Sequence, residues 1–516
     1  MRMVPINNKM PKAFLEVGGQ TLIERLIMQL NEAGVTDISV VVGFMKEHFE
    51  FLTDKYNINL IQNDDFATKN NLHSLLLAKD KISSTYIVPC DVWCRKNPFK
   101  AKETHSWYMV SDMVDNDSDV RVNQNLELYK ISNKNGGNAM LGICYLQGRD
   151  TIRLKDNLAA MSNDPLCDSA FWEEALYDKD NKMFVKAKVI SCTDYFEVNT
   201  YEQLRSLDDS SKNLKSNVIA IIAQTLKVNP KDISNITVLK KGMTNRSFLF
   251  SCKAKRYIMR IPGEGTDLLI NRKQEAEVYR AISALGICDD IVYINEQNGY
   301  KITEFLPSAR VCDADNVKDL RLCMKKLREF HNLKIKVSHT FDVFSQIEYY
   351  ESLWEGEKSV YKDYAATKEN VFSLRDFVKE NADKFALTHI DAVPDNFLFT
   401  TDKSGKTDIR LIDWEYAGMQ DPHVDIAMFC IYSLYNKKQV DRLINIYFAD
   451  SCNEKTRTKI YCYIAMCGLL WSNWCEYKRI LGVEFGEYSL RQYKYAKDYY
   501  KIAMKRISKE SQGKKQ

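Results

Sequence analysis

The sequence has 516 residues, too many for a single hydrophobic core, so at least two domains are expected. With 45% hydrophobic residues the chain should fold, and a net charge of +4 argues against a dedicated nucleic-acid-binding protein. Its fourteen cysteines lack zinc-site spacing, which indicates reduced thiols in a cytoplasmic protein. No apolar run reaches membrane-spanning length, and no signal peptide opens the chain.

The first domain is predicted to cover residues 1–207, with helices and apolar strands in alternation. Helices are expected at 21–34, 45–56 and 70–80, and strands at 37–44, 58–63 and 85–91. Such alternation predicts an α/β domain with a Rossmann-like, mostly parallel sheet. Asp91 ends the last of these strands, where α/β sheets bind ligands, and its carboxylate could hold magnesium.

Two stretches of this domain carry a resemblance to known enzymes. Residues 2–27, RMVPINNKMPKAFLEVGGQTLIERLI, resemble the sugar-nucleotide and phosphocholine nucleotidyltransferases, and residues 63–78 resemble the phosphocholine cytidylyltransferase branch. The matching positions in the opening are Arg2, Pro5, Pro11 and Lys12. The resemblance implies CTP as co-substrate, Arg2 in nucleotide binding, Lys12 in catalysis and Asp91 as a magnesium ligand.

The chain departs from that family in two places. The initial strand and the Gly-rich loop that cradles the triphosphate do not precede Arg2. We therefore expect a competent kinase but a poor cytidylyltransferase, with the strand and loop encoded in frame upstream. The family's second metal carboxylate, in an E-x-D pattern, is replaced by Glu197 and Asn199. Glu197 is the predicted second ligand, because Asn199 brings no negative charge.

Trp172 and Glu173 form a further candidate site in the first domain. In the resembling enzymes an aromatic and acidic pocket here receives the choline head group, through cation–π attraction for the quaternary ammonium. The alternative, in which Trp172 is an ordinary core residue, is left open.

Residues 208–216 are polar and Ser-rich and predict a linker. The second domain is expected over residues 217–505, as an α+β bilobal fold of the protein-kinase type, and residues 506–516 as a disordered basic tail. Its first strands flank the turn 241–247, KGMTNRS, which places Thr244 and Asn245 over the phosphates of a nucleotide.

The next strand and helix supply a candidate ion pair. Arg260 stands where protein kinases carry the lysine of their third strand, and its guanidinium group can form bidentate contacts with phosphate. The following helix offers Glu275 or Glu277 as its partner, and Glu275 is preferred; a solvated helix face is the alternative for both. His331 is interpreted as a packed helical residue.

Residues 389–425 contain the pattern on which the function depends. His389, Asp391 and Asn396 follow H-x-D-x-x-x-x-N, and the apolar run IRLIDW then carries Asp413. Phosphoryl transfer from ATP needs one carboxylate to orient and deprotonate a hydroxyl, and an Asn and a second carboxylate to hold Mg²⁺. Asp391 fits the first role, and Asn396 and Asp413 fit the second. An ordinary surface turn is the alternative.

The region 217–505 resembles the choline and ethanolamine kinases of the aminoglycoside-phosphotransferase-like fold. The motifs GMTNRSF, YIMRIPGEGT, INRKQEAE, HIDAVPDN and IDWEYAG follow that family's order, and LLWSNWCEY and VEFGEY come later. The resemblance implies that Tyr416, Trp471 and Trp474 enclose a trimethylammonium group. Helical i, i+3 spacing puts both tryptophans on one face, where their rings attract a cation, although an aromatic core stripe is the alternative.

The expected function is therefore a fusion that makes phosphocholine from choline and ATP, and then CDP-choline from phosphocholine and CTP. The alternatives are an ethanolamine, aminoglycoside or other small amino-alcohol kinase, with a first domain that only binds or dimerises. Small-molecule substrates are the expected partners, without nucleic acid or membrane, and a homodimer stays open.

Overall fold

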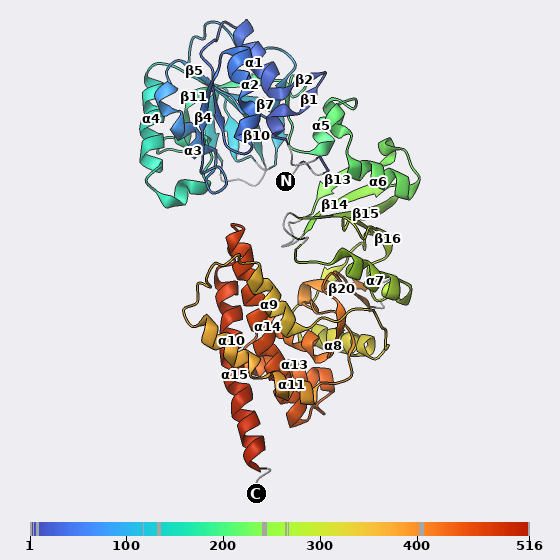
Figure 1. Cartoon of the computed structure of the whole chain (residues 1–516). Helices are drawn as coiled ribbons and strands as arrows, with labels where there is room; N and C mark the ends of the chain where they lie inside the picture. Colours follow the sequence, from blue (N-terminus) through green and yellow to red (C-terminus); the bar gives the residue numbers. More distant parts are fainter. Residues whose placement is uncertain are drawn as a thin grey trace. The chain divides into compact units, whose positions relative to one another are not determined.

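The computed structural model describes residues 3, 5–6, 10–116, 118–131, 136–239, 245–263, 266, 268–401 and 407–513. The chain forms two compact units, Met1–Val238 and Leu239–Gln516 (Figure 1). Each unit is described by itself below.

The first unit is an α/β domain, as predicted. Its helices are α1 (Leu22–Glu32), α2 (Phe51–Tyr56), α3 (Asn71–Leu77), α4 (Arg149–Met161), α5 (Tyr201–Leu207) and α6 (Asn217–Leu226). Its strands are β1 (Glu16–Val17), β2 (Gln20–Thr21), β3 (Ser39–Val42), β4 (Asn59–Gln62), β5 (Thr85–Ile87), β6 (Val92–Cys94), β7 (Trp107–Asp115), β8 (Val120–Val122), β9 (Glu127–Lys130), β10 (Gly137–Leu146), β11 (Lys182–Ile190), β12 (Tyr195–Glu197) and β13 (Ser234–Val238).

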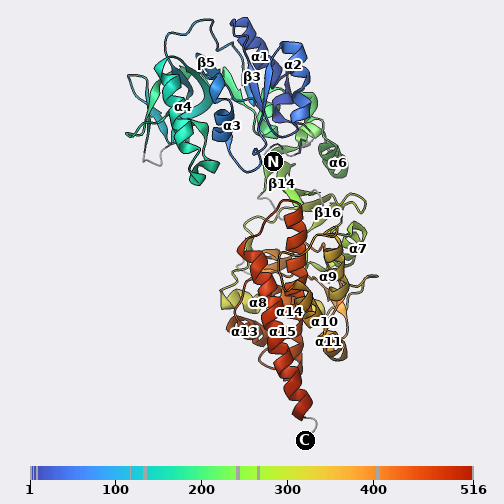
Figure 2. The same ribbon diagram turned by 60° about the vertical axis from the view of Figure 1, so that its left-hand side comes forward.

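Helices cover both faces of the central sheet. Side chains alternate along β7, so that Trp107 and Met109 join one apolar cluster and Tyr108 and Val110 join another. The first cluster includes buried apolar residues of α1 and α2, and the second includes those of α3 and α4 (Figures 1 and 2). This three-layer arrangement exposes the strand ends to ligands.

The expectation of a mostly parallel sheet is wrong, because the described strand pairs are mixed. The six-stranded sheet has the order β5-β10-β7-β11-β9-β8, and among its described pairs only β7 and β11 run parallel. The strands β3 and β4 form a second parallel pair. The reason is the length of the connections, because parallel neighbours need a crossover of about a dozen residues or more. Residues 123–126, for example, join β8 to β9 directly, so these two strands must run antiparallel.

The predicted linker, residues 208–216, packs on the first unit. The Gly18 N–H donates to the Asp208 carboxylate over 2.8 Å, and Ser211 Oγ donates to the Glu16 carbonyl over 2.7 Å. The Glu16 N–H donates in turn to Asn213 Oδ1 over 2.8 Å. These bonds fix the segment to the β1–β2 hairpin, and the first unit continues through α6 and β13, beyond the predicted boundary.

The second unit has two lobes. Its helices are α7 (Arg272–Ile282), α8 (Val317–His331), α9 (Val343–Ser352), α10 (Tyr364–Phe372), α11 (Arg375–Asn381), α12 (His423–Tyr432), α13 (Lys437–Phe448), α14 (Glu454–Ile480) and α15 (Glu487–Gly513). Its strands are β14 (Asn245–Cys252), β15 (Lys255–Pro262), β16 (Ile291–Ile294), β17 (Lys301–Glu304), β18 (Arg310–Val311), β19 (Ala386–Thr388), β20 (Phe397–Thr401), β21 (Thr407–Leu411) and β22 (Gly418–Gln420).

The smaller lobe is an antiparallel sheet in the order β14-β15-β17-β16, accompanied by α7. The larger lobe is helical and contains the short pairs β19–β22 and β20–β21, which carry the motif residues. A single apolar cluster fills this lobe, and α14 is buried along most of its length. Its buried positions run without a gap from Thr458 to Lys478, so every side of this helix packs in the core.

The C-terminal residues are helical, in contrast to the disordered tail predicted from residue 506. The helix α15 continues to Gly513, and Arg506 Nε donates to Thr458 Oγ1 of α14 over 3.2 Å. All fourteen cysteines are free thiols, as expected. Within the described part of the chain, no helix combines the length and apolar composition that crossing a bilayer requires.

Candidate active sites

The loop after β19 carries the H-x-D pattern, and Asp425 of α12 holds it in place. The N–H groups of His389 and Ile390 donate to the two oxygens of the Asp425 carboxylate, over 3.0 and 2.7 Å. Ile390 adopts a left-handed φ of 67°, which these bonds stabilise. His331 Nε2 lies 3.0 Å from the same carboxylate, so this histidine is packed, as interpreted from the sequence.

Asn396 fixes the Asp391 carboxylate at the end of this loop. Asn396 Nδ2 donates to the Asp391 carbonyl over 2.8 Å and to Asp391 Oδ2 over 3.1 Å. Burial, together with the charges of Asp413 and Glu415, raises the pKa of Asp391 well above its usual range. The amide nitrogen of Asn396 is thus committed to Asp391, and its amide oxygen is the atom that can ligate a cation.

Asp413 follows β21 and is brought beside the same loop by contacts of its neighbour, Ile412. His389 Nε2 lies 2.9 Å from the Ile412 carbonyl oxygen, and the Ile412 N–H donates to the Asn396 carbonyl over 2.9 Å. Asp413 itself has a left-handed φ of 66°, which turns the chain at this point. The structure thus brings Asp391, Asn396 and Asp413 together.

The donor set of this site fits Mg²⁺. The Asp413 carboxylate and the Asn396 amide oxygen are the oxygen ligands that this ion prefers, and it would neutralise phosphate charge when bound. Glu415, which the sequence reasoning missed as a site residue, lies close by with a buried side chain. Burial and the Asp413 charge raise the pKa of Glu415 to about 7, so a cation here would favour its ionised form.

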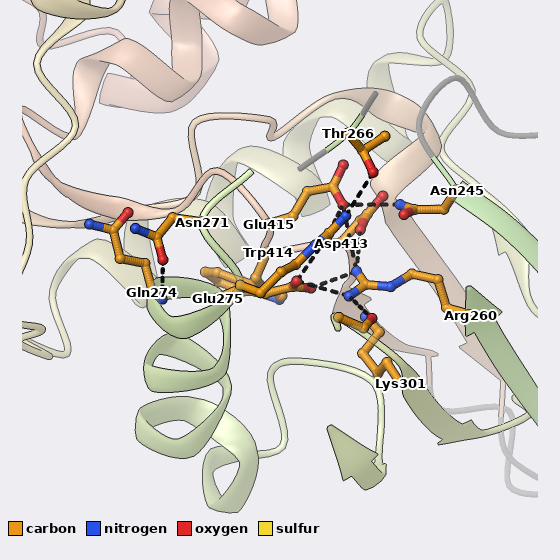
Figure 3. Close-up of polar contacts among 12 residues, drawn as sticks. Asn245, Arg260, Thr266, Asn271, Gln274, Glu275, Lys301, Asp413, Trp414 and Glu415 are labelled. Carbon is orange, nitrogen blue, oxygen red and sulfur yellow. Dashed lines mark hydrogen bonds and ion pairs between the residues drawn. The ribbon is translucent and has the colours of Figure 1, made fainter. Parts of the chain in front are cut away.

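Arg260 of β15 and Glu275 of α7 form the predicted ion pair (Figure 3). The two guanidinium nitrogens Nη1 and Nη2 donate to the two carboxylate oxygens over 2.5 and 2.8 Å. Nη1 also lies 3.6 Å from both Asp413 and Glu415. Burial opposes ionisation of Glu275, but Arg260 lowers its pKa to about 2. The pair therefore stays charged and points a cation at residues 413–417, the candidate metal-binding segment.

Arg272 is a second buried cation that the sequence reasoning missed. Its Nη1 lies 3.1 Å from Glu275 and 3.5 Å from Glu415, and its Nη2 donates to Thr266 Oγ1 over 3.2 Å. The i, i+3 spacing between Arg272 and Glu275 was the available signal. Arg260 and Arg272 thus both contact the buried carboxylates of Glu275 and Glu415. Each of these four charged side chains therefore has a partner of opposite charge.

The turn expected over the phosphates is described only in part. Thr244 lies outside the described residues. Asn245, the first residue of β14, is buried, and its Nδ2 donates to Glu415 Oε2 over 3.0 Å (Figure 3). The start of β14 is therefore tied to the candidate metal-binding segment.

The predicted aromatic residues lie in the larger lobe. The rings of Tyr416 and Trp471 meet edge to face with centroids 5.7 Å apart, and the Trp474 ring lies 5.2 Å from that of Phe485. Each of the three predicted residues is more than nine-tenths buried. Their burial alone is compatible with the aromatic core that the sequence left as an alternative.

Four tyrosines connect this aromatic region with Asp391. Burial raises the pKa of each of their hydroxyls, and the Asp391 carboxylate raises it further in every case; they are Tyr350, Tyr416, Tyr432 and Tyr488. Such coupling requires proximity to the carboxylate. Tyrosine hydroxyls from four separate segments thus lie within electrostatic range of Asp391, and only Tyr416 among them was a predicted site residue.

In the first unit, Lys12 joins two of the predicted metal-site positions. Lys12 Nζ donates to Asn199 Oδ1 over 2.6 Å and lies 3.7 Å from Asp91 Oδ2. Asp91 precedes β6, which pairs with β12, and this pairing places the exposed Glu197 opposite Val92. Lys12, Asp91 and Asn199 therefore converge, at side chains that remain partly open to solvent. The predicted nucleotide contact Arg2 lies outside the described residues.

Trp172 and Glu173 lie in a more buried part of this unit. Trp172 belongs to an apolar cluster, with its ring 6.0 Å from that of Tyr108. Tyr108 donates its hydroxyl to Glu173 Oε1 over 3.1 Å. Burial raises the pKa of Glu173 to about 7. The acidic group expected from the sequence is present, and whether Trp172 contacts a ligand stays a prediction.

One further group of acidic and histidine side chains resembles a metal site. Asp383, Asp421 and His423 bring ligand atoms within 4.8 Å of one another. The buried Lys459 amine, however, lies 3.0 Å from Asp383 and 2.7 Å from Asp421. This ammonium supplies the positive charge that the carboxylates need, so we assign the cluster a structural role.

A two-lobed fold with a buried Arg–Glu pair, a held aspartate loop and a neighbouring acidic segment defines the second unit as a phosphotransferase of the kinase-like class. Residues 236–475 match the family model for choline/ethanolamine kinases, and residues 2–99 match that for MobA-like NTP transferase domains. The chain thus combines a choline/ethanolamine kinase domain with an NTP transferase domain.

Individual relatives cover one unit each. A choline-phosphate cytidylyltransferase of Streptococcus pneumoniae is 26% identical, over 41% of this chain and 94% of the relative. The protein LicA of Haemophilus influenzae is 28% identical, over 48% of this chain and 96% of the relative. A 2-aminoethylphosphonate cytidylyltransferase of Lancefieldella rimae is 26% identical, over 40% of this chain and 87% of the relative. The crystal structure of choline kinase LicA from S. pneumoniae is 27% identical with a TM-score of 0.48, covering 56% of this chain and all of that one.

Proposed function

We propose that the second unit transfers the γ-phosphoryl group of ATP to choline. The observation that carries this proposal is the edge-to-face contact between Trp471 and Tyr416, which follows Asp413 by three residues. A trimethylammonium group forms no hydrogen bonds, and its cation is attracted to the faces of Tyr and Trp rings. Residues Tyr416, Trp471 and Trp474 are the proposed contacts of this group. The match to the choline/ethanolamine kinase family model supports an acceptor of this kind.

In this proposal Asp391 orients the choline hydroxyl and accepts its proton. Asn396 and Asp413 would hold Mg²⁺, which would offset phosphate charge, and Arg260 would add positive charge beside them. Bound Mg²⁺ would also supply the positive charge that favours the ionised form of Asp391. As expected from the sequence, residues 244–245 are proposed to lie near the nucleotide.

We further propose that the first unit transfers CMP from CTP to phosphocholine, so that the chain makes CDP-choline in two steps. Lys12 is proposed to approach a phosphate of CTP, and Asp91 and Glu197 are the proposed ligands of the metal that would accompany CTP. Arg2 is proposed to contact the nucleotide. The convergence of Lys12, Asp91 and Asn199 supports this assignment.

The test is a product analysis by mass spectrometry after incubation with ATP, CTP, Mg²⁺ and choline. We expect the wild-type chain to make phosphocholine readily and CDP-choline only slowly. Asp91→Asn should make phosphocholine without CDP-choline, and Asp391→Asn should make neither product from choline yet still convert added phosphocholine at the wild-type rate. Conversion of ethanolamine in preference to choline would overturn the acceptor assignment. Conversion of 2-aminoethylphosphonate in preference to phosphocholine would overturn that of the first unit.

A further inference from the structure

The helix α7 carries two glutamates with different surroundings. Glu275 and Glu277 are two positions apart, so their side chains leave the helix on opposite sides. Glu275 is buried against Arg260, whereas Glu277 is one-third exposed and contacts the segment that precedes α9. The sequence offered Glu277 as the less favoured partner of Arg260, but Glu275 takes that place. The contacts of Glu277 in the structure are specific.

Glu277 receives three hydrogen-bond contacts from two adjacent residues. The Ser338 N–H and the Ser338 hydroxyl each donate to the carboxylate over 2.7 Å, and His339 Nδ1 lies 3.3 Å from Oε2. These bonds, those of Ser338 first, lower the pKa of Glu277. A carboxylate with this many partners is fixed in position although it is one-third exposed.

His339 continues this contact to the metal-binding segment. Its Nε2 lies 2.8 Å from the carbonyl oxygen of Ala417, four residues after Asp413. The backbone of His339 is also anchored, because its carbonyl accepts the Met419 N–H over 3.0 Å. A Cβ on Gly418 would lie 3.3 Å from the His339 ring, so glycine allows this close packing.

The connection also reaches the loop after β19, which carries His389 and Asp391 and is called the catalytic loop below. The strand β22 contains Met419 and pairs with β19, whose last residue precedes His389. The chain of contacts therefore runs from α7 through Glu277 and His339 to the segments that bear Asp413 and Asp391. On the opposite side of α7, the Glu275 carboxylate holds Arg260 toward Asp413.

We propose that Glu277 and His339 are positioning residues that clamp α7 to the metal-binding segment and so keep Arg260 aligned with Asp413. This inference rests on the proposed kinase function. Neither side chain touches a reacting atom in the proposal. Their effect passes through the position of α7, as in other kinases whose Arg- or Lys-to-Glu pair must be in place for phosphoryl transfer.

The test compares Glu277→Ala and His339→Ala with the control Arg280→Ala. Arg280 lies on the same helix and forms an exposed ion pair with Glu296. Each clamp variant should lower kcat for choline phosphorylation about three- to tenfold, while KM for ATP and choline changes less than about twofold. The double variant should lose no more than about the larger single loss, because both side chains serve one contact.

Two further variants separate the clamp from a general loss of folding. Glu277→Gln keeps an acceptor for Ser338 and should recover part of the loss, and Ser338→Ala should have a smaller effect than Glu277→Ala. Full additivity of the two alanine variants, or an equal loss in Arg280→Ala, would overturn the proposal.

Hydrogen–deuterium exchange in the full chain gives a readout that does not depend on activity. We expect faster exchange of amides in 272–282 and 417–420 in both clamp variants, and unchanged exchange there in Arg280→Ala. Unchanged exchange in the clamp variants contradicts the clamp even where the wild type phosphorylates choline. If the clamp variants exchange faster but the wild type does not phosphorylate choline, the contact between α7 and the segment 417–420 is supported and only the proposed function is refuted.

Discussion

The two candidate sites of this chain are built from similar residue types in different environments. In the kinase unit, two arginines and two glutamates are buried and contact one another; they are Arg260, Arg272, Glu275 and Glu415. In the NTP transferase unit, the Lys12 and Asp91 side chains are 35% and 26% exposed, and 3.7 Å separates their charged atoms. Charges that are buried must be compensated within the fold, whereas partly exposed charges are compensated by water.

This difference has consequences for how each site tolerates substitution. A buried network is held rigid by the cost of leaving any member unpaired, so it aligns groups before the substrate arrives. An open site relies on the substrate and its metal to complete the arrangement. We therefore expect substitutions in the kinase network to reduce stability and activity together, and substitutions at Lys12 or Asp91 to reduce activity alone.

The largest expected effect follows from removing Arg260. Arg260→Met leaves the Glu275 carboxylate in an apolar environment with less compensation, which typically costs about 3–5 kcal/mol of unfolding free energy. Chemical denaturation of the full chain, followed by a probe in the kinase unit, measures this loss. Asp91→Asn is the matched control, and its unfolding free energy should change by less than about 0.5 kcal/mol. Equal losses in the two variants would contradict the comparison.

The next effect concerns catalysis without a matching loss of stability. Asp391→Ala should lower choline phosphorylation by about a hundredfold or more, because the positioned base is lost. Removal of a buried carboxylate surrounded by Asp413 and Glu415 relieves repulsion, so the fold should remain intact. Steady-state kinetics and a thermal melt measure the two quantities. Turnover near the wild-type rate would refute the assignment of Asp391.

The sequence predicted the residues that local motifs carry. His389, Asp391 and Asn396 lie close together in the chain, and Asp413 follows on the next hairpin, so the chain itself brings them near one another. The pairing of residue 260 with residue 275 was predictable because a strand and the following helix have few ways to pack. The α/β and kinase-like classes followed from the order of elements.

The missed residues depend on contacts between distant segments. Asp425 reaches the catalytic loop from a helix much later in the chain, as the separations of 36 and 35 residues show. Tyr350 and Tyr432 approach Asp391 only after the larger lobe has packed. The mixed sheet was missed because strand direction is set by the length of the connections and by pairing, and periodicity does not report either.

A pH-dependent prediction tests the buried part of the NTP transferase unit. Burial raises the pKa of Glu173 from 4.5 to about 7. Between these two pH values the folded protein therefore holds a proton that the unfolded chain has released. The free energy of unfolding should therefore fall as the pH rises through this window, from about 5 to 7. Glu173→Gln removes this dependence and should stabilise the unit by about 2 kcal/mol at a pH of about 8. Denaturation curves at the two ends of this range measure the difference, and an unchanged dependence in the variant would exclude Glu173 as its source.

The smallest expected effect concerns the acceptor site. Trp471→Ala and Trp474→Ala should each raise KM for choline about five- to thirtyfold, which corresponds to cation–π contacts of roughly 1–2 kcal/mol, with little change in KM for ATP. Trp354→Ala is the matched control, because Trp354 is equally buried but donates its Nε1 to the Asn473 carbonyl over 3.2 Å. This control should lower the melting temperature and leave KM for choline unchanged. A loss of stability in Trp471→Ala without a change in KM for choline would assign Trp471 to the aromatic core. The kinase unit would then have its buried network of charges but no aromatic pocket for the acceptor.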